Sequence, residues 1–413
     1  MNQRPLAIDL FAGCGGMSLG LEAAGFDVVA AVEIDPVHAL VHEVNFPYGV
    51  TFCRDIRHLQ WPEMRQAIER RGYSTADIDL LTGGPPCQGF SVMGKRQLGD
   101  PRNQLIFEYV RLLRDIQPKY FIFENVQGLT GQRHQGMLKQ LCQSLGEAGY
   151  HVLPPQVLNG ADYGAPQRRK RLILLGYRRD VPSVAYPAPS HGPGLAPYVT
   201  VHEAIADLET IPVFTDIDRG IVPPEPLGTF GRSLHEQFRH CHSRHLEPNF
   251  LWGHLGSQHQ PEIQARFRAT PPGKKEAISR LFKLDAQGLS NTLRAGTPTE
   301  KGSFTAPRPI HYQLPRCISI REAARLHTFP DWFQFHRKVW HGFREIGNAV
   351  LPLLAQKIAQ EIIHTLDIQP DLLPQKTIHI TQTDALWYPL GQASQYWEIP
   401  RHLVPRRRRL SPP

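Results

Sequence analysis

The sequence contains few cysteines, six among 413 residues, and no two of them form a Cys-x-x-Cys pair. Scattered cysteines argue against a disulfide framework and against a zinc site built on thiolates. The chain also lacks an apolar run long enough to cross a bilayer, and its first residues, MNQRPLAIDLF, lack the layout of a signal peptide. We therefore expect a cytoplasmic protein with no membrane partner. The cysteines are Cys14, Cys53, Cys87, Cys142, Cys241 and Cys317.

An excess of acidic residues is also missing. The chain has 46 lysines and arginines against 38 aspartates and glutamates, which gives a formal net charge of +8. A basic balance is compatible with a polyanionic partner, although it does not establish one. The length allows two or three domains with a sizeable core.

Residues 6–178 alternate between short apolar runs and helical patterns. The runs LAIDLF, VVAAVEID, VTFCRDI, IDLLTGG, YFIFENV and RLILLGY predict strands, and residues 104–116 and 135–148 predict helices. This alternation indicates an α/β fold with a largely parallel sheet and helices on both faces. Ligands bind such sheets at the carboxyl ends of the strands, so the loops there should carry the chemistry.

The composition changes after residue 180. VPSVAYPAPSHGPGLAPY is rich in proline and glycine and is typical of a linker. Residues 183–300 carry many His, Pro and Arg without a strand–helix alternation, and we interpret them as a second, irregular domain. Helical patterns return in SIREAARLHTF and GNAVLPLLAQKIAQEIIHTL. The chain ends in a basic, proline-flanked tail that includes Arg406 to Arg409.

A glycine loop, DLFAGCGGMSLGLEAAG, connects the first strand to a helix. Gly13 and Gly15 lie in the turn, but Ser18 stands where the dinucleotide-binding fingerprint requires a third glycine. Glu33 ends the second strand about 20 residues later, where a carboxylate can hold both hydroxyls of a ribose. The pattern predicts a site for an adenosine-containing cofactor, with a purely structural turn as the alternative. Asp55, after the third strand, is placed to meet an adenine amino group or, more simply, to cap a helix.

One cysteine is preceded by residues that restrict the backbone. In LLTGGPPCQGFSVMGKR, two glycines and two prolines precede Cys87. Glycine permits tight turns and proline fixes φ, so the thiol is held at a defined place past a strand end. A lone cysteine in such a place is more often a small buried hydrophobe. The rigid frame and the polar loop after it favour a nucleophile.

Two further stretches carry candidate catalytic groups. In YFIFENVQGL, Glu124 follows four apolar residues. Apolar surroundings favour the protonated carboxyl group that a general acid needs; an exposed loop glutamate is the alternative. YGAPQRRKRLILLG places four cations before a strand. If Arg171 begins the strand, alternation puts Arg169 and Arg171 on one face and Arg168 and Lys170 on the other. One pair would then point into the site and the other would meet phosphates, unless the run is merely a solvated surface.

In this order, these stretches resemble the DNA (cytosine-5) methyltransferase family. DLFAGCGG, GGPPCQGFS, ENV and NGADYGAPQRRKR match within residues 6–178, and RCISIREAARLHTFPD and GNAV match within residues 316–358. The resemblance covers roughly half of the chain, and no core motif is interrupted. It implies a Rossmann-like, S-adenosylmethionine-dependent methyltransferase sheet and a smaller, irregular target-recognition domain.

The resemblance also implies a division into domains. Residues 1–182 would form the first part of the catalytic and cofactor-binding domain, and residues 183–300 the target-recognition domain. Residues 301–365 would return to the catalytic domain, with GNAV folding back onto the N-terminal sheet. Residues 366–413 would be a C-terminal extension with the basic tail.

The chemistry follows from the family as well. Cys87 would add to carbon 6 of a cytosine, Glu124 would protonate or hydrogen-bond ring nitrogen 3, and Arg169 and Arg171 would hold the carbonyl oxygen of the base and order the pocket. The base would be flipped out of the duplex, and the loop 88–104 would close over it. The DNA contacts would be Ser91, Lys95, Arg96 and Arg102. S-Adenosylmethionine would be the methyl donor, held by Phe11, Gly13, Gly15, Glu33, Asp55, Pro86 and Asn348.

Double-stranded DNA is the partner that the resemblance implies, and a restriction–modification pair would add a cognate restriction endonuclease. We expect a monomer in the bacterial cytoplasm, associated with the nucleoid. Arginine is suited to recognising guanine, and the candidates in the recognition domain are Arg219, Arg232, Arg239, Arg244, Arg266 and Arg268.

Three other functions compete with this interpretation. A dinucleotide-dependent oxidoreductase would leave Pro-Pro-Cys, ENV and the arginine block unexplained. A catalytically silent DNA-binding relative is disfavoured because every candidate catalytic residue is present. The RNA-modifying branch of the family is disfavoured by the CQGFS context and the long variable region.

One cluster carries residue types found at zinc sites. The stretch RHCHSRHLEPNFLWGH lacks the two-plus-two ligand spacing of a zinc site, and the chemistry needs no metal. We therefore interpret it as polar loops that face DNA, with a metal site as the alternative. Its members are His240, Cys241, His242, His245 and His254.

Overall fold

The computed structural model describes residues 3–86, 104–213, 228–245, 251–296, 308–380 and 382–400. Several predictions fall outside these ranges: the nucleophile Cys87, the DNA contacts Ser91, Lys95, Arg96 and Arg102, the candidate Arg219 and the basic tail. Within the described ranges, no helix combines the length and the apolar character that a membrane span requires.

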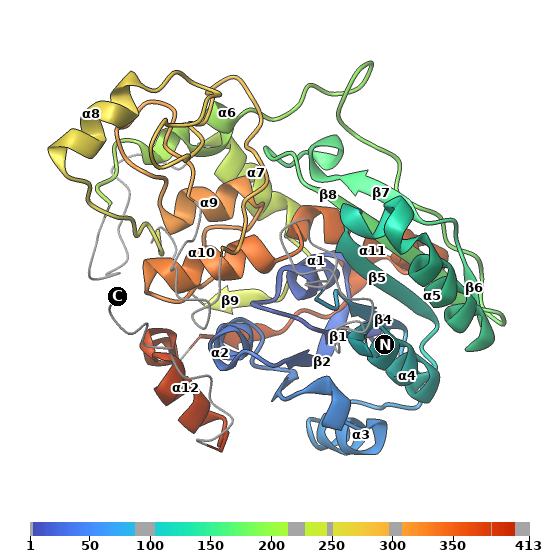
Figure 1. The fold of residues 1–413 in the computed structure, drawn as a ribbon. Coiled ribbons are helices and arrows are strands. Elements are labelled where there is room, and N and C mark those ends of the chain that lie inside the picture. Colours follow the sequence, from blue (N-terminus) through green and yellow to red (C-terminus); the bar gives the residue numbers. More distant parts are fainter. Residues whose placement is uncertain are drawn as a thin grey trace.

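One mixed sheet forms the centre of the molecule (Figure 1). Its strand order is β3-β2-β1-β4-β5-β8-β6, and β7 pairs with β8. Strands β1 to β5 run parallel, whereas β8 runs antiparallel to β5, β6 and β7. The α/β sheet is confirmed, with an antiparallel end that the sequence did not predict. The strands are Leu6–Leu10 (β1), Asp27–Glu33 (β2), Val50–Cys53 (β3), Leu80–Gly83 (β4), Tyr120–Val126 (β5), Tyr150–Val152 (β6), Gln156–Asn159 (β7) and Lys170–Arg178 (β8).

The strand order reverses at β1, which lies between β2 and β4. The chain passes from β1 outward to β2 and β3 on one side and later to β4 and β5 on the other. In open sheets of this kind, ligands bind at the carboxyl ends of the strands beside such a reversal. The glycine loop after β1, Glu33 at the end of β2 and the Gly-Gly-Pro-Pro segment after β4 all lie at that edge.

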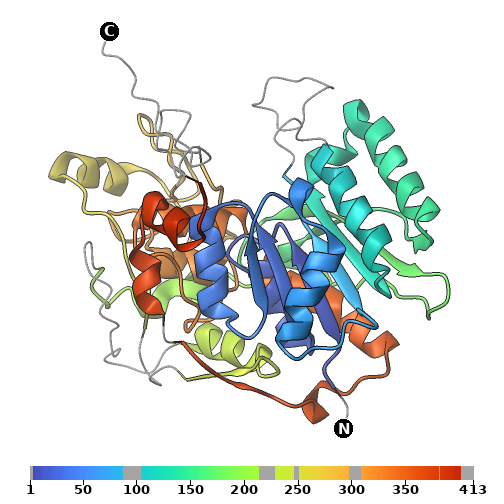
Figure 2. The ribbon, with the colours of Figure 1, turned by 90° about the horizontal axis from the view of Figure 1, so that it is seen from below.

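Helices cover both faces of the sheet (Figures 1 and 2). α1 (Gly16–Ala24) and α11 (Pro352–Thr365) share one apolar cluster with β1, β4 and β5. α3 (Trp61–Arg70), α4 (Gln104–Ile116) and α5 (Gln135–Glu147) share another cluster with the opposite face. α1 and α11 approach closely because Gly20 has no side chain: a Cβ there would lie 2.5 Å from the Ala355 Cβ. The C-terminal helix α11 thus packs against the N-terminal part of the chain, and the assignment of residues 301–365 to the catalytic domain stays a prediction.

A second group of helices lies beside the sheet: α6 (Val201–Ile205), α7 (Thr229–Gln237), α8 (Pro261–Ala269), α9 (Ile320–Leu326) and α10 (Val339–Asn348). α9 begins with a capping box, in which Ser319 Oγ accepts from Glu322 N (3.0 Å) and the Glu322 carboxylate accepts from Ser319 N (2.6 Å). α6, α7, α9 and α10 form one core with α1 and α2 (Pro36–Asn45). The region predicted to recognise DNA therefore shares its core with the catalytic part, and the domain boundaries themselves stay a prediction.

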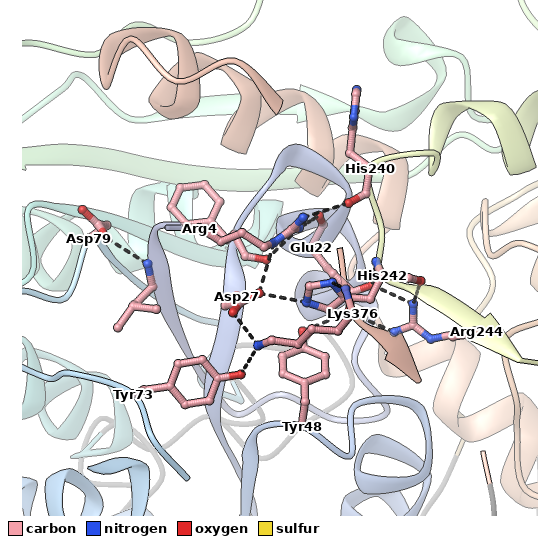
Figure 3. A network of polar contacts seen from close by, with 12 residues as sticks. Arg4, Glu22, Asp27, Tyr48, Tyr73, Asp79, His240, His242, Arg244 and Lys376 are labelled. Carbon is pink, nitrogen blue, oxygen red and sulfur yellow. Dashed lines mark hydrogen bonds and ion pairs between the residues drawn. The ribbon is translucent and has the colours of Figure 1, made fainter. Parts of the chain in front are cut away.

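The C-terminal extension is integrated into the fold up to residue 400. Its strand β10 (Thr377–His379) pairs parallel with β9 (Ser243–His245), and α12 (Leu390–Tyr396) packs on α2. Lys376 Nζ lies 2.7 Å from Asp27 Oδ2, and His242 Nε2 lies 2.8 Å from Asp27 Oδ1 (Figure 3). These contacts join the extension, the stretch before β9 and the start of β2.

Candidate active site

The glycine loop between β1 and α1 is built on left-handed backbone. Phe11, Gly13 and Gly15 have φ angles of 59°, 57° and 102°, a region that residues with side chains rarely adopt. At Gly15, packing also requires glycine, because a Cβ would lie 2.4 Å from Phe46 Cε2. At Gly13, nothing lies within 4 Å of the Cβ position. The loop turns tightly and leaves open space over Gly13, where a ligand can approach the backbone.

Glu33 is tied to this loop. One carboxylate oxygen accepts a hydrogen bond from Gly13 N and the other from Asp35 N, each at 2.8 Å. Desolvation by the surrounding protein raises the pKa of Glu33, although part of the side chain remains accessible. The next residue, Ile34, is 62% exposed. A carboxylate with spare lone pairs beside an exposed apolar side chain fits a ribose and the face of an adenine.

Ile34 is not among the cofactor-binding residues predicted from the sequence. A large apolar residue directly after a strand-ending acid is the signal that would suggest it as a candidate.

Asp55 follows β3 and caps the short 3₁₀ helix η1 (Ile56–His58). Its carboxylate accepts from Arg57 N at 3.0 Å and also pairs with the Arg57 guanidinium. These hydrogen bonds lower the pKa of Asp55. The capping role, given above as the simpler alternative, is present, and contact with an adenine stays a prediction.

A chain of buried hydrogen bonds, not predicted from the sequence, supports the loop. Ser18 Oγ lies 2.6 Å from Asp9 Oδ2 and 3.0 Å from His42 Nε2, and His42 Nδ1 lies 3.2 Å from Thr51 Oγ1. Burial lowers the pKa of His42 to about 3, so its ring is neutral. When Ser18 donates to Asp9, the Nε2–H of His42 donates to Ser18, and the Thr51 hydroxyl donates to Nδ1. The serine that breaks the dinucleotide fingerprint therefore joins β1 and α1 to α2 and β3.

The segment that leads to the predicted nucleophile is fixed by β5. Asn125 Nδ2 donates to the Pro85 carbonyl at 3.1 Å, and Asn125 is 3% exposed. Gly84 lies so close to Glu124 that a Cβ would sit 2.8 Å from Glu124 Oε2. Pro86 is exposed. Cys87 is the next residue in the sequence and lies outside the described residues.

Glu124 itself is paired with a cation. Its side chain is 12% exposed, and its Oε1 lies 2.7 Å from Arg171 Nε. Both residues belong to paired strands, since Val126 of β5 is opposite Arg171 of β8. The predicted apolar setting is therefore incomplete: Glu124 follows an apolar strand, but its carboxylate faces a guanidinium. The structure brings an acid, a cation and the proline-rich segment to one place.

The arginine block alternates as predicted. Arg168 and Lys170 are exposed, whereas Arg169 and Arg171 point inward. Arg169 is 1% exposed, and its guanidinium donates to the carbonyls of Leu293 (2.9 Å), Gly347 (3.0 Å) and Ala349 (2.8 Å). It joins the start of β8 to residues 293 and 347–349, and its role in ordering a base pocket stays a prediction. The direct contact with a base that the resemblance implies is better suited to Arg171. Asn348, between two of these carbonyl partners, is exposed.

The candidate base-recognising arginines have different surroundings. Arg244 is excluded, because its side chain is 2% exposed and pairs with the fully buried Glu22 at 2.6 Å. Arg239 pairs with Asp371 at 3.3 Å on the surface. Those that remain at least partly exposed are Arg232, Arg239, Arg266 and Arg268.

The prediction that the histidine-rich stretch forms polar loops facing DNA is wrong for its described members His242 and His254, which are 2% and 1% exposed. Among the described residues, no three His, Cys, Asp or Glu side chains converge as metal ligands. His242 pairs with Asp27, and Cys241 is buried. His254 hydrogen-bonds the Ile211 carbonyl (3.1 Å) and Ser319 Oγ (3.0 Å).

Comparison with known proteins gives a consistent result. The profile of the C-5 cytosine-specific DNA methylase family matches residues 6–364. The chain is 44% identical to Type II methyltransferase M.XorII of Xanthomonas oryzae pv. oryzae, with 92% of each chain covered. It is 32% identical to Type II methyltransferase M.DdeI of Desulfomicrobium norvegicum, over 86% of this chain and 88% of that protein.

Comparison with solved structures gives similar folds. A protein encoded within an E. coli prophage and described as a DNA modification methyltransferase is 32% identical with a TM-score of 0.71, over 88% of this chain and 99% of that one. Dnmt2 methyltransferase of S. pombe shares the fold at 16% identity, with a TM-score of 0.50 over 88% of this chain and all of its own. The chain therefore belongs to the C-5 cytosine-specific DNA methylase family and is a DNA (cytosine-5) methyltransferase.

Proposed function

We propose that this chain flips a cytosine out of double-stranded DNA and methylates carbon 5 with S-adenosylmethionine, through a transient bond between Cys87 and carbon 6. The placement of Glu124 supports this most strongly. Its carboxylate lies against Gly84, three residues before Cys87, and pairs with Arg171. The carboxylate that we propose as the general acid thus lies beside Gly84 and a cation.

The strand ends fit the methyl donor. Glu33 would hold the ribose hydroxyls, Ile34 would cover one face of the adenine, and the open space over Gly13 would admit the ligand. Phe11, Gly15, Asp55, Pro86 and Asn348 complete the proposed set. When bound, S-adenosylmethionine supplies a methyl group on a positively charged sulfur.

The residues of the chain would carry out the other steps. The Cys87 thiolate adds to carbon 6 while Glu124 gives a proton to ring nitrogen 3, so the ring becomes an enamine with a nucleophilic carbon 5. After carbon 5 has taken the methyl group, a base such as water removes its proton. The bond to carbon 6 then breaks, the thiolate leaves, and Glu124 recovers its proton. A positioned general acid contributes about 10²–10⁴ in rate.

Two features of the chain would serve the DNA itself. Arg171 would hold the carbonyl oxygen of the flipped base, and Arg169 would keep the pocket in shape by its three carbonyl contacts. Ser91, Lys95, Arg96 and Arg102 would contact the duplex. Flipping costs roughly a few kcal/mol, which contacts to the extrahelical base offset. The Type II names of the relatives support a cognate restriction endonuclease as a second partner.

Bisulfite sequencing of DNA from a host that expresses the chain tests the proposal. We expect 5-methylcytosine at one short recurring sequence, and none when Cys87→Ala is expressed at the same level. Unmethylated DNA in both hosts, or methylation confined to RNA, would overturn it.

A further inference from the structure

A short hairpin follows α8 and exposes a large apolar side chain between cationic ones. Residues 273–283 are held by backbone hydrogen bonds from Gly273 N to Lys283 O (3.0 Å), from Lys283 N to Lys274 O (2.8 Å) and from Glu276 N to Leu281 O (2.8 Å). Below, these residues are called the 273–283 hairpin. It follows α8, and its Lys283 contacts the Phe267 carbonyl of that helix (Figure 1).

The hairpin exposes an apolar side chain and a strained arginine at its tip. Ile278 is 70% exposed, more than the other large apolar side chains of the described residues. Arg280 is exposed and has a φ of 60°, which an arginine adopts at a steric cost. Arg280 ends a turn in which its N–H donates to the Glu276 carbonyl at 3.0 Å, and a left-handed residue is common at such an end. The turn therefore explains the backbone of Arg280, but the exposed Ile278 side chain contributes nothing to the core.

The base of the hairpin is rigid. Glu276 is 3% exposed, and its carboxylate accepts from Ser279 N at 2.5 Å and lies 3.3 Å from Arg266 Nε. The Lys283 ammonium is turned inward and donates to the Phe267 carbonyl at 2.9 Å. The tip is therefore presented in one defined conformation, which lowers the entropic cost of binding a partner.

The exposed charge of the hairpin is positive. Lys274, Lys275 and Arg280 are exposed, whereas its single acidic residue, Glu276, is the buried anchor. An apolar side chain between cations matches the major groove of DNA. There, phosphates line the rim, guanine offers two acceptors to an arginine, and thymine offers a methyl group.

The hairpin is connected to the active site by a short, hydrogen-bonded path. Beyond it, Leu284 N donates to Ile310 O (2.9 Å), and Ser290 N donates to Pro166 O (2.9 Å). Arg168 N then donates to Ser290 O (2.9 Å), directly before the strand that carries Arg171. Ten residues separate Arg280 from Ser290, which span at most roughly 36 Å.

We infer that the 273–283 hairpin recognises the DNA sequence: Arg280 and Ile278 contact base edges in the major groove, and Lys274 and Lys275 contact phosphates. This inference rests on the proposed function and specifies which residues choose the site. The recognised base pairs lie within about one helical turn of the methylated cytosine, because the connection to the active site is short.

A methylation library tests the inference. Full-length protein methylates duplexes with randomised positions around a cytosine, and bisulfite sequencing reports the preferred bases. Arg280→Ala should lower discrimination for guanine at one position by roughly 10–100-fold. Ile278→Ala should lower the preference for thymine at a neighbouring position by several fold. The double variant Lys274→Ala/Lys275→Ala should keep the preference, weaken binding to all sequences, and reduce the salt slope by about 0.9 per lost phosphate contact.

Matched controls separate recognition from folding. Leu372→Ala removes an apolar side chain that is 67% exposed elsewhere, and Arg70→Ala removes an exposed arginine on α3; both should leave the preference unchanged. Arg280→Gly removes the backbone strain together with the side chain, so it should lose the guanine preference with an unchanged or raised melting temperature.

Two outcomes would overturn the inference, and they are distinguishable. If wild-type protein methylates a defined site and the Ile278 and Arg280 variants choose the same site, the hairpin does not recognise bases. If wild-type protein methylates no DNA, the proposed function fails, and the inference fails with it.

Discussion

Replacing Arg244 by alanine should destabilise the protein far more than replacing an exposed arginine nearby. The Arg244 and Glu22 side chains are 2% and 0% exposed, and two nitrogen–oxygen distances of 2.6 and 2.9 Å join them (Figure 3). Arg244 also donates to the Asn45 carbonyl at 2.9 Å and lies 4.3 Å from the centre of the Trp332 ring. Its removal opens a gap and leaves a buried carboxylate without this cation.

The size of the effect follows from burial. Removing one partner of a buried ion pair costs about 3–5 kcal/mol, and the hydrogen bonds that Glu22 keeps, from Tyr48 (2.9 Å) and His242 N (3.0 Å), favour the lower end. The unfolding entropy is about 2.1 cal/mol/K per residue, or roughly 0.9 kcal/mol/K over 413 residues. The melting temperature should therefore fall by about 3–6 °C if the chain unfolds cooperatively.

The pH dependence adds a second signature. Burial alone would raise the pKa of Glu22, but the charge and hydrogen bonds of Arg244 outweigh it and hold the pKa below its ordinary value. A lowered pKa stabilises the fold above the pKa of the unfolded state, and this stability is lost as the pH falls through the folded-state pKa. The difference between Arg244→Ala and wild type should be largest at neutral pH and should shrink in acid.

Thermal unfolding followed by circular dichroism measures the effect. Arg239→Ala is the matched control: its side chain is 54% exposed and pairs with Asp371, which is 68% exposed, so its loss should cost at most about 1 kcal/mol. Replacing both buried partners, as in Glu22→Gln with Arg244→Met, should recover part of the stability. A melting temperature for Arg244→Ala equal to that of Arg239→Ala would refute the reasoning.

Three further variants test the site and its support. Glu124→Gln should keep cofactor affinity by calorimetry but lower kcat by about 10² or more; a rate within about threefold of wild type would argue against a general acid. Asn125→Ala removes the hydrogen bond to the Pro85 carbonyl. It should lower kcat by up to about 100-fold with little change in KM, since a misplacement of 1 Å can cost that much. A change confined to KM would contradict a role of Asn125 in positioning the segment before Cys87. Burial raises the pKa of Glu345 to about 7, so the wild-type fold loses stability as the pH rises from about 4.5 through 7. Glu345→Gln should therefore be more stable at pH 8 by up to about 3 kcal/mol in denaturant titrations and should differ little at pH 4; equal stability at pH 8 would contradict the assignment.

The parallel half of the sheet could be predicted from the sequence because buried parallel strands are apolar on both faces. VVAAV in β2 and YFIF in β5 are continuous apolar runs. β6 and β7 escaped prediction because they are only three and four residues long and carry His151 and Gln156 among their exposed positions. Strands this short are defined by pairing with β8 and not by their own pattern.

In the site, too, residues placed by their local sequence could be predicted, and contacts between distant residues could not. Residues fixed by local sequence, such as Glu33 at the end of β2 and Glu124 near the end of β5, could be placed on their strands in advance because period and turn chemistry are local. Partners brought together by the tertiary fold could not. Glu22 and Arg244 are 222 residues apart, and Arg169 meets carbonyls more than a hundred residues away. A run of cations cannot reveal which member will be buried.

Covalent trapping tests the central claim most directly. Duplex DNA that carries 5-fluorocytosine at the methylated position is incubated with wild-type protein and S-adenosylmethionine, and the products are separated under denaturing conditions and weighed by mass spectrometry. We expect a stable adduct, because fluorine at carbon 5 cannot leave as a proton does and the thiol remains bonded to carbon 6. The adduct should map to the peptide that contains Cys87 and be absent with Cys87→Ala. An active wild-type protein that forms no adduct, or an adduct that persists in the alanine variant, would contradict the account.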